Sequence, residues 1–195
     1  MDDHVFSRTP KMLRAIEKDT EECGFTMASE PKTGALLAVL AASKPAGRIL
    51  ELGTGTGFGT AWLLSGMDAT AQLETVDSHS DVVAVARRHL GKDSRVTFHV
   101  MDGAEYIGRL PEREFDLIYA DAWPGKFTHL GQALSLLRLG GIYFIDDLIP
   151  QPNWPERHAP KVPALIEELE GRSEFATVKL TWASGLMLVV RTEAA

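Results

Sequence analysis

Cysteine, clusters of basic residues and long apolar runs are all scarce in this sequence of 195 residues. Cys23 is the only cysteine, which excludes an internal disulfide bond and a Cys-x-x-Cys metal site. The formal net charge is −7 and no basic run could neutralise a line of phosphates, so we expect no nucleic-acid partner. The longest apolar segment, residues 34–42, is too short to cross a bilayer, and the first residues do not form a secretory signal. We therefore expect a cytoplasmic protein with no membrane partner.

The order of apolar and amphipathic segments indicates an α/β protein. The length fits one domain, with N-terminal helices in residues 1–45 and an α/β core in residues 46–195. Expected strands alternate with expected helices, which predicts a parallel sheet covered on both faces. The five expected strands are 48–52, 72–76, 96–100, 115–120 and 141–145. The helices between them are expected near 58–67, 80–90, 104–110 and 127–137.

The two ends of the chain depart from this alternation. A first helix is expected to begin at Thr9-Pro10 and to end at Gly24, and a second to cover residues 33–42. The apolar residues 35–40 suit either the core or a homodimer interface, and the sequence leaves both open. After a helix near 160–170, segments 175–180 and 186–191 flank a short turn, which predicts an antiparallel hairpin. The expected sheet therefore has seven strands, mostly parallel.

Four glycines follow the first expected strand, in the stretch ELGTGTGFG of residues 51–59. Ligands of open α/β sheets bind outside the carboxyl ends of the strands, so we expect a ligand here. Phe58 and Thr60 stand where the third glycine of the dinucleotide-binding G-x-G-x-x-G pattern would be. Glu51 would repel a pyrophosphate and would favour a cofactor with ammonium and sulfonium groups. An NAD-dependent oxidoreductase is therefore disfavoured.

On the motif from Glu51 to Gly59, the sequence resembles the class I, Rossmann-like, S-adenosylmethionine-dependent methyltransferases. The resemblance extends from about residue 30 to the end of the chain and implies a Rossmann-like three-layer α/β/α sandwich. It implies S-adenosyl-L-methionine as the cofactor. The cofactor-binding residues that it implies are Glu51, Gly53, Gly55, Gly57, Phe58, Gly59, Asp77, Ser78, Asp102, Gly103, Asp121 and Trp123.

Individual residues in this set have roles that the resemblance suggests. Asp77, 24 residues after Gly53, can accept both ribose hydroxyls, and Asp102 with Gly103 is expected beside the adenine. Asp77 and Asp102 could instead cap the helices that follow them. Trp123 could pack on the adenine or form the floor of an acceptor pocket, and a purely structural role is the alternative.

Residues 115–127 and 141–150 look like the catechol O-methyltransferase type and its small bacterial relatives. That type has an aspartate after the fourth strand and an Asp-Asn pair after the fifth, and the matching positions here are Asp121, Asp146 and Asp147. The resemblance implies that these oxygens hold Mg²⁺ or another divalent cation. Such a cation would favour the deprotonated form of an acceptor hydroxyl, whose pKa in a phenol is about 10. Asp147 replaces the family's asparagine, which makes this group of residues more acidic. The sequence is therefore equally consistent with a site in which one of the three acids is protonated and no metal is bound.

The family's lysine, three residues after the first aspartate, is replaced here by Pro124. Lys126 is our candidate for the base or orienting residue, with Asp121 as its catalytic partner, and a solvated loop lysine is the alternative. Residues 151–160 are typical of a loop over a site, and Trp154 and His158 are candidates to face the acceptor. His79 is a candidate for the border of the adenine pocket.

The leading hypothesis is an O-methyltransferase that acts on a small-molecule hydroxyl, with metal assistance left open. The alternatives are a metal-independent N- or carboxylate-methyltransferase and a non-catalytic S-adenosylmethionine-binding module. The sequence does not name the acceptor. Its specificity is expected to come from the N-terminal segment and from loops 123–129 and 148–160.

Overall fold

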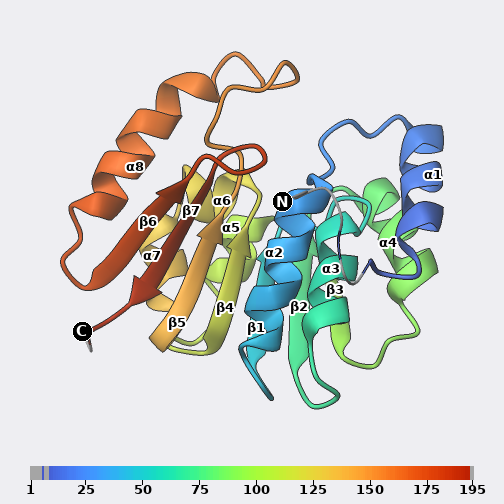
Figure 1. Cartoon of the computed structure of the whole chain (residues 1–195), viewed down its shortest axis with the longest axis horizontal. Coiled ribbons are helices and arrows are strands. Elements are labelled where there is room, and N and C mark those ends of the chain that lie inside the picture. The colour runs from blue at the N-terminus through green and yellow to red at the C-terminus, as the bar shows by residue number, and fades with distance from the viewer. Residues whose placement is uncertain (1–5, 7–8, 194–195) are drawn as a thin grey trace.

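A mixed sheet of seven strands forms the middle layer of the protein (Figure 1). The computed structural model describes residue 6 and residues 9–193. The strands are β1 (Arg48–Leu52), β2 (Gln72–Asp77), β3 (Val96–Val100), β4 (Phe115–Ala120), β5 (Leu137–Ile145), β6 (Phe175–Leu180) and β7 (Leu186–Arg191). Their order is β3-β2-β1-β4-β5-β7-β6; the first five pair in parallel, and β7 runs antiparallel to β5 and β6. The predicted sheet with a C-terminal antiparallel hairpin is confirmed.

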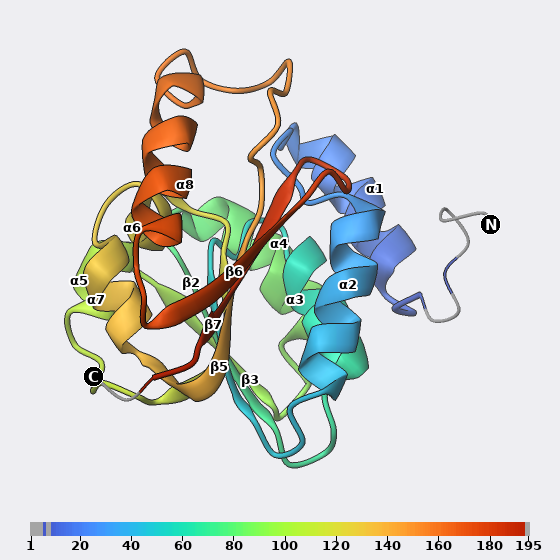
Figure 2. The same ribbon diagram turned by 60° about the vertical axis from the view of Figure 1, so that its left-hand side comes forward.

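Helices cover both faces of the sheet, as Figure 2 shows. They are α1 (Leu13–Cys23), α2 (Pro31–Ala42), α3 (Phe58–Gly66), α4 (Ser80–Leu90), α5 (Gly103–Ile107), α6 (Trp123–Lys126), α7 (Leu130–Ser135) and α8 (Val162–Glu170), with a 3₁₀ turn at Ala159–Lys161. The buried side chains of α5, α7 and α8 share one core cluster, and those of α1, α2 and α3 contribute to a second on the other face. The first helix begins at Leu13 and not at Pro10, and Gly24 ends it in a left-handed conformation with φ 71°.

The apolar helix α2 packs mainly inward. Leu37 and Ala41 are buried in the core, and α2 packs along α3. Gly34 permits this contact, because a Cβ there would lie 2.2 Å from the indole of Trp62. Val39 on the outer side is 65% exposed. The homodimer alternative for residues 35–40 stays a prediction.

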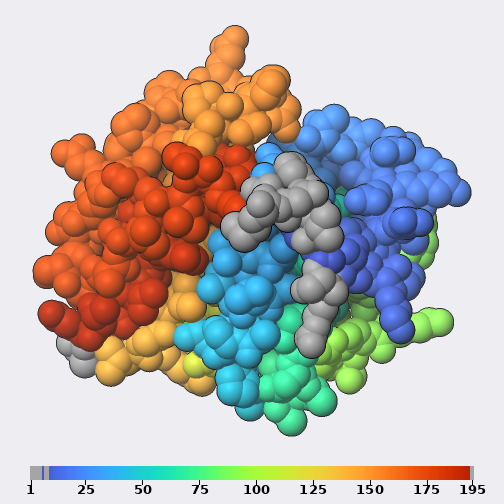
Figure 3. Space-filling model, in the orientation of Figure 1, coloured from blue at the N-terminus to red at the C-terminus, as the bar shows by residue number. Residues whose placement is uncertain are grey.

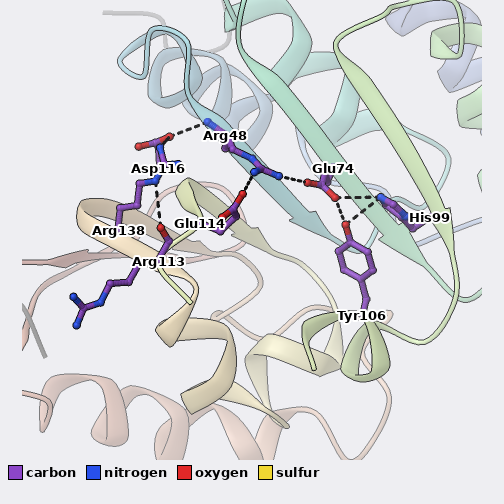
Figure 4. Close-up of polar contacts among 8 residues, drawn as sticks. All are labelled: Arg48, Glu74, His99, Tyr106, Arg113, Glu114, Asp116 and Arg138. Atoms are coloured by element: carbon purple, nitrogen blue, oxygen red, sulfur yellow. Dashed lines mark hydrogen bonds and ion pairs between the residues drawn. The ribbon is translucent and has the colours of Figure 1, made fainter. Parts of the chain in front are cut away.

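A polar cluster connects neighbouring strands of the sheet with helix α5 (Figure 4). The Arg48 guanidinium pairs with Glu74 at 2.7 Å and also with Glu114. The hydroxyl of Tyr106 donates to Glu74, whose carboxylate lies 3.3 Å from Nε2 of His99. These contacts tie β1, β2 and β3 to α5 and to Glu114, the residue before β4.

The strand order places a crevice where ligands bind in such sheets. The connection from β1 leads to β2 on one side, and β4 lies on the other side of β1, so the order reverses between β1 and β4. At such a reversal the loops after the two strands diverge and leave space at their carboxyl ends. No helix in the described part of the chain is long and apolar enough to cross a bilayer.

Candidate active site

A cavity of about 430 Å³ lies at the carboxyl ends of β1, β2, β4 and β5. Its volume is in the range of pockets that hold small organic ligands. The loops after these strands form its floor, and residues 25–30 and 151–158 form its outer wall. Predicted site residues on its lining are Gly53, Gly55, Gly59, Asp77, Ser78, His79, Asp102, Gly103, Asp121, Trp123, Lys126, Asp146, Asp147, Trp154 and His158.

The glycine loop after β1 adopts backbone conformations that side chains disfavour. Gly53 has φ 105°, and a Cβ on it would lie 2.7 Å from the carbonyl oxygen of Asp121. Gly57 has φ 92°, and its Cβ would lie 2.7 Å from that of Ala86 in α4. Gly57 and Phe58 do not line the cavity. Gly57 lies against α4, and Phe58 is buried with Leu13 and Trp62, so the cofactor contacts predicted for these two residues stay predictions.

Glu51 also lies behind the loop and does not line the cavity. Its side chain is fully buried, and its Oε2 accepts hydrogen bonds from Thr60 at 2.5 Å and Thr75 at 2.6 Å. Its Oε1 has no hydrogen-bond partner in the described structure, and a Cβ on Gly59 would lie 2.5 Å from it. Burial raises the pKa of Glu51 to about 8, against the lowering effect of the two threonines. In this position Glu51 supports the loop from behind, and the direct ligand contact predicted for it stays a prediction.

Asp77 ends β2 and faces the cavity beside the glycine loop. Its Oδ2 accepts from the backbone N–H of Gly55 at 3.0 Å, and its Oδ1 accepts from that of His79 at 3.0 Å. Each carboxylate oxygen has two lone pairs, so Oδ2 retains one for a ligand, whereas Oδ1 also lies 3.1 Å from Nδ1 of His79. The capping role weighed for Asp77 is not observed, because α4 begins after His79 without a side-chain cap.

Asp102 and Gly103 form the neighbouring part of the wall, at the start of α5. Oδ1 of Asp102 accepts from the N–H groups of Ala104 at 2.8 Å and Glu105 at 3.1 Å, so the capping role of Asp102 is confirmed. Gly103 lies against Pro124, which a Cβ would approach to 3.2 Å. The α5 terminus and the 123–126 turn therefore enclose this end of the cavity together.

The acids after β4 and β5 surround the hydroxyl of Tyr119. This hydroxyl lies 3.0 Å from Oδ2 of Asp121, 3.2 Å from Oδ2 of Asp146 and 2.9 Å from Oγ of Ser29. Oδ1 of Asp146 accepts from the hydroxyl of Ser184 and from the N–H of Asp147. Burial raises the pKa of Asp121 to about 7, with the Lys126 charge opposing that rise. Burial also raises the pKa of Asp146.

Lys126 reaches this group of acids because of the two residues before it. Pro124 (φ −62°, ψ 130°) and Gly125 (φ 89°, ψ −23°) have the dihedral angles of a type II turn. The hydroxyl of Tyr143 donates to the carbonyl oxygen of Gly125 at 2.7 Å and fixes the turn. Lys126 is consequently 3% exposed, and its Nζ lies 4.0 Å from Oδ1 of Asp121. The alternative of a solvated loop lysine is wrong.

The three acids do not converge as metal ligands. Divalent cations need several oxygens at 2.0–2.6 Å from one point. Within the described residues, no group of three or more His, Cys, Asp or Glu side chains is placed to hold a metal ion. Asp147 turns away at a left-handed residue with φ 70°, where its Oδ2 lies 4.0 Å from Nε2 of His158. The predicted site of Asp121, Asp146 and Asp147 does not fit a divalent cation.

The outer wall brings together two segments that are far apart in the chain. The side-chain amide of Asn153 donates to the carbonyl oxygen of Thr26 at 2.9 Å. In the space-filling view, the orange segment after β5 and the blue segment before α2 meet at the top of the molecule (Figure 3). Trp154 stacks on His158 with ring centroids 4.0 Å apart. Burial lowers the pKa of His158, so its imidazole favours the neutral form.

Three residues of the site have no local signal in the sequence. Ser29 lies in an irregular segment, Tyr119 in an apolar strand, and Ser184 in the hairpin turn. Ser29 reaches Asp121 across 92 positions of the chain, and Ser184 reaches Asp146 across 38. Tyr119 is two positions from Asp121 but 27 from Asp146. Only the strand order, which brings β1, β4, β5 and β7 side by side, reveals this grouping.

Comparisons with known proteins agree with this architecture. A family model described as a methyltransferase domain matches residues 50–148. A Mycolicibacterium vanbaalenii protein named as an O-methyltransferase is 34% identical over 119 residues, which cover 58% of this chain and 53% of that protein. The chain thus spans about half the length of the curated relatives that it matches.

Solved structures cover nearly the whole chain. A Klebsiella pneumoniae structure, also named as an O-methyltransferase, has a TM-score of 0.81 and 25% identity and covers 96% of this chain and 92% of its own. The O-methyltransferase of Bacillus cereus, solved in complex with SAH, has a TM-score of 0.82 and 19% identity and covers 97% of this chain and 94% of its own. At this identity the second likeness concerns the fold.

Proposed function

The chain belongs to the methyltransferase domain family, and from that premise we propose that it transfers a methyl group from S-adenosylmethionine to a hydroxyl of a small molecule. The observation that carries this proposal is the cavity itself. One end is formed by the glycine loop, Asp77 and Asp102, and the other by Lys126 and Asp121. The names of the relatives and the SAH complex of the Bacillus cereus protein support the same cofactor and reaction class.

The cofactor end has the donors and acceptors that a nucleoside requires. Asp77 would accept one ribose hydroxyl at Oδ2, and a second at Oδ1 once the exposed ring of His79 turns aside. Ser78, Asp102 and Gly103 would enclose the adenine, with Trp123 at its edge. Gly53 and Gly55 would let the backbone approach the amino-acid part of the cofactor. Glu51 would act through the loop, because its side chain lies outside the cavity.

The acceptor end supplies a positive charge and a proton acceptor. When bound, S-adenosylmethionine supplies an electrophilic methyl group, whose bond to the sulfonium sulfur breaks as the acceptor oxygen attacks. Lys126 would hold that oxygen, and Oδ1 of Asp121 would take the hydroxyl proton. A proton acceptor works best when its pKa is near the working pH, and the pKa of Asp121 is raised to about 7. The wall formed by Trp154 and His158 would limit the access of water.

The test is calorimetric titration of the protein with S-adenosylmethionine, followed by a screen of small hydroxyl compounds with methyl-labelled cofactor. We expect one cofactor bound per chain and label transfer to at least one acceptor. Binding without transfer to any acceptor would favour a non-catalytic cofactor-binding module. Absence of binding would refute the proposal.

A carboxylate acceptor is a second candidate, because the buried Lys126 ammonium matches a carboxylate as well as an oxyanion. The two acceptors give products of different stability: methyl esters hydrolyse in mild base, whereas methyl ethers do not. Loss of the label from the product in base would identify the carboxylate acceptor.

A further inference from the structure

We propose that the acceptor end of the cavity works without a divalent cation, and that the ammonium of Lys126 supplies the positive charge that holds the acceptor oxygen. The inference rests on the proposed methyl transfer and specifies how this site would support it. It also assigns Tyr119 as a positioning residue, since its hydroxyl draws Asp121 and Asp146 together.

The oxygens of Asp146 are engaged by the protein. Oδ1 accepts from the hydroxyl of Ser184 and from the N–H of Asp147 at 2.7 Å. Oδ2 lies 3.2 Å from the hydroxyl of Tyr119. Asp146 is 2% exposed, so it has little freedom to turn toward a cation in the cavity. Its hydrogen bonds would have to be given up before it could serve as a metal ligand.

One oxygen of Asp121 is also engaged by the protein. Its Oδ2 lies 3.0 Å from the hydroxyl of Tyr119 and accepts from Oγ of Ser29 at 3.3 Å. Its Oδ1 is the oxygen that faces Lys126. The positive charge nearest to this oxygen is therefore part of the chain. Asp147, the third acid, points toward His158 instead of toward the other two.

The position of Lys126 is built into the fold. The type II turn at Pro124-Gly125 carries the lysine inward, and it depends on glycine. A Cβ on Gly125 would lie 2.4 Å from Leu52 and 2.8 Å from the hydroxyl of Tyr143. A lysine held at 3% exposure in this way has lost most of its rotamer freedom before an acceptor arrives. A fixed ammonium in a largely enclosed site stabilises a developing oxyanion more strongly than one in water.

The experiment is a calorimetric titration of the full chain with Mn²⁺ and, separately, with Mg²⁺, at neutral pH. We expect the unaltered protein to show no saturable binding tighter than about 1 mM. The variant Lys126→Met removes the ammonium that faces Asp121. The double variant Lys126→Met with Tyr119→Phe also removes the hydroxyl that contacts Asp121 and Asp146. Each variant should bind Mn²⁺ at least about tenfold more tightly than the unaltered protein, because unpaired carboxylates attract cations. Lys92→Met, at an exposed lysine between α4 and β3, is the matched control and should not change.

Two results would overturn the inference. One is a single Mn²⁺ site in the unaltered protein that Asp146→Asn abolishes. The other is that both Lys126 variants, shown to be folded by circular dichroism, gain no affinity for Mn²⁺. A parallel titration with S-adenosylmethionine in the presence of EDTA separates this inference from the proposed function. Failure of cofactor binding would refute the methyl transfer, whereas the Mn²⁺ result alone decides whether a metal site exists.

Discussion

Replacing the buried Glu51 by glutamine should make the protein more stable above neutral pH. In the folded protein burial raises the pKa of this carboxyl from its ordinary value of 4.5 to about 8. Between these two pH values the folded chain retains a proton that the unfolded chain has released, so stability falls as pH rises through that window. At about 1.4 kcal/mol per pH unit, the loss due to Glu51 reaches about 4–5 kcal/mol at and above pH 8.

Glutamine removes the titration while it preserves most of the packing. Its side-chain oxygen can still accept hydrogen bonds from Thr60 and Thr75, and it has nearly the volume of glutamate. At pH 5, where Glu51 is protonated, the two proteins should therefore have similar stability. At pH 8 to 9 the variant should be more stable by several kcal/mol, within the upper bound of about 5 kcal/mol.

Urea denaturation at five pH values between 5 and 9 measures this difference directly. Glu112→Gln, at an exposed glutamate before β4, is the control and should leave the pH profile unchanged. A Glu51→Gln variant whose stability differs from that of the unaltered protein by the same amount at every pH would refute the reasoning. The same variant also tests the contact predicted from the sequence. Cofactor affinity within about threefold of the unaltered protein would agree with support from behind the loop, and a loss above about tenfold would indicate direct contact.

Three further predictions concern residues of the loops around the cavity. Asp77→Asn should weaken S-adenosylmethionine binding by about tenfold or more in calorimetry, because a charge-assisted hydrogen bond contributes about 1.5–3 kcal/mol; unchanged affinity would exclude the ribose contact. Gly57→Ala should lower the free energy of unfolding by about 2–3 kcal/mol in urea denaturation, since φ is 92° and the new Cβ would meet Ala86 at 2.7 Å; a neutral substitution would mean that α4 moves freely. Methyl transfer should rise with pH through about 7, as Asp121 loses its proton. Asp121→Asn should abolish that rise along with most of the rate, and a variant with the original pH profile would assign the step to another group.

Much of the fold could be predicted from local sequence patterns. The strands β1, β3, β4, β6 and β7 begin and end where their apolar patterns do. The predicted boundaries were wrong where the backbone conformation departs from what the apolar pattern indicates. The segment expected as a helix at 127–137 begins only at Leu130, because His129 has φ 57° and the preceding turn is fixed by Trp123. Strand β5 begins at Leu137, four residues early, since a bulge lets Phe115 pair with it.

The candidate site was predictable only where its residues follow strands in a recognisable motif. Gly53, Asp77 and Asp102 are examples, because the carboxyl ends of parallel strands meet at one edge of a sheet. The partners of the acids were not predictable, since Ser29 and Ser184 reach them from segments without a motif. The same holds for the three acids of the possible metal site, because side chains outside the motif engage two of them in this structure.

The segments of the outer wall lie outside the part of the chain that the family model matches. Residues 50–148 hold the glycine loop and the acids, whereas Thr26 and Asn153, joined across the cavity, lie on either side of that range. Substitutions in these flanking segments would therefore change the outer wall of the cavity while the glycine loop and the acids keep their sequence. The hydrogen bond between Asn153 and Thr26 joins these two flanking segments, so a substitution of Asn153 should loosen the outer wall of the cavity on both sides at once.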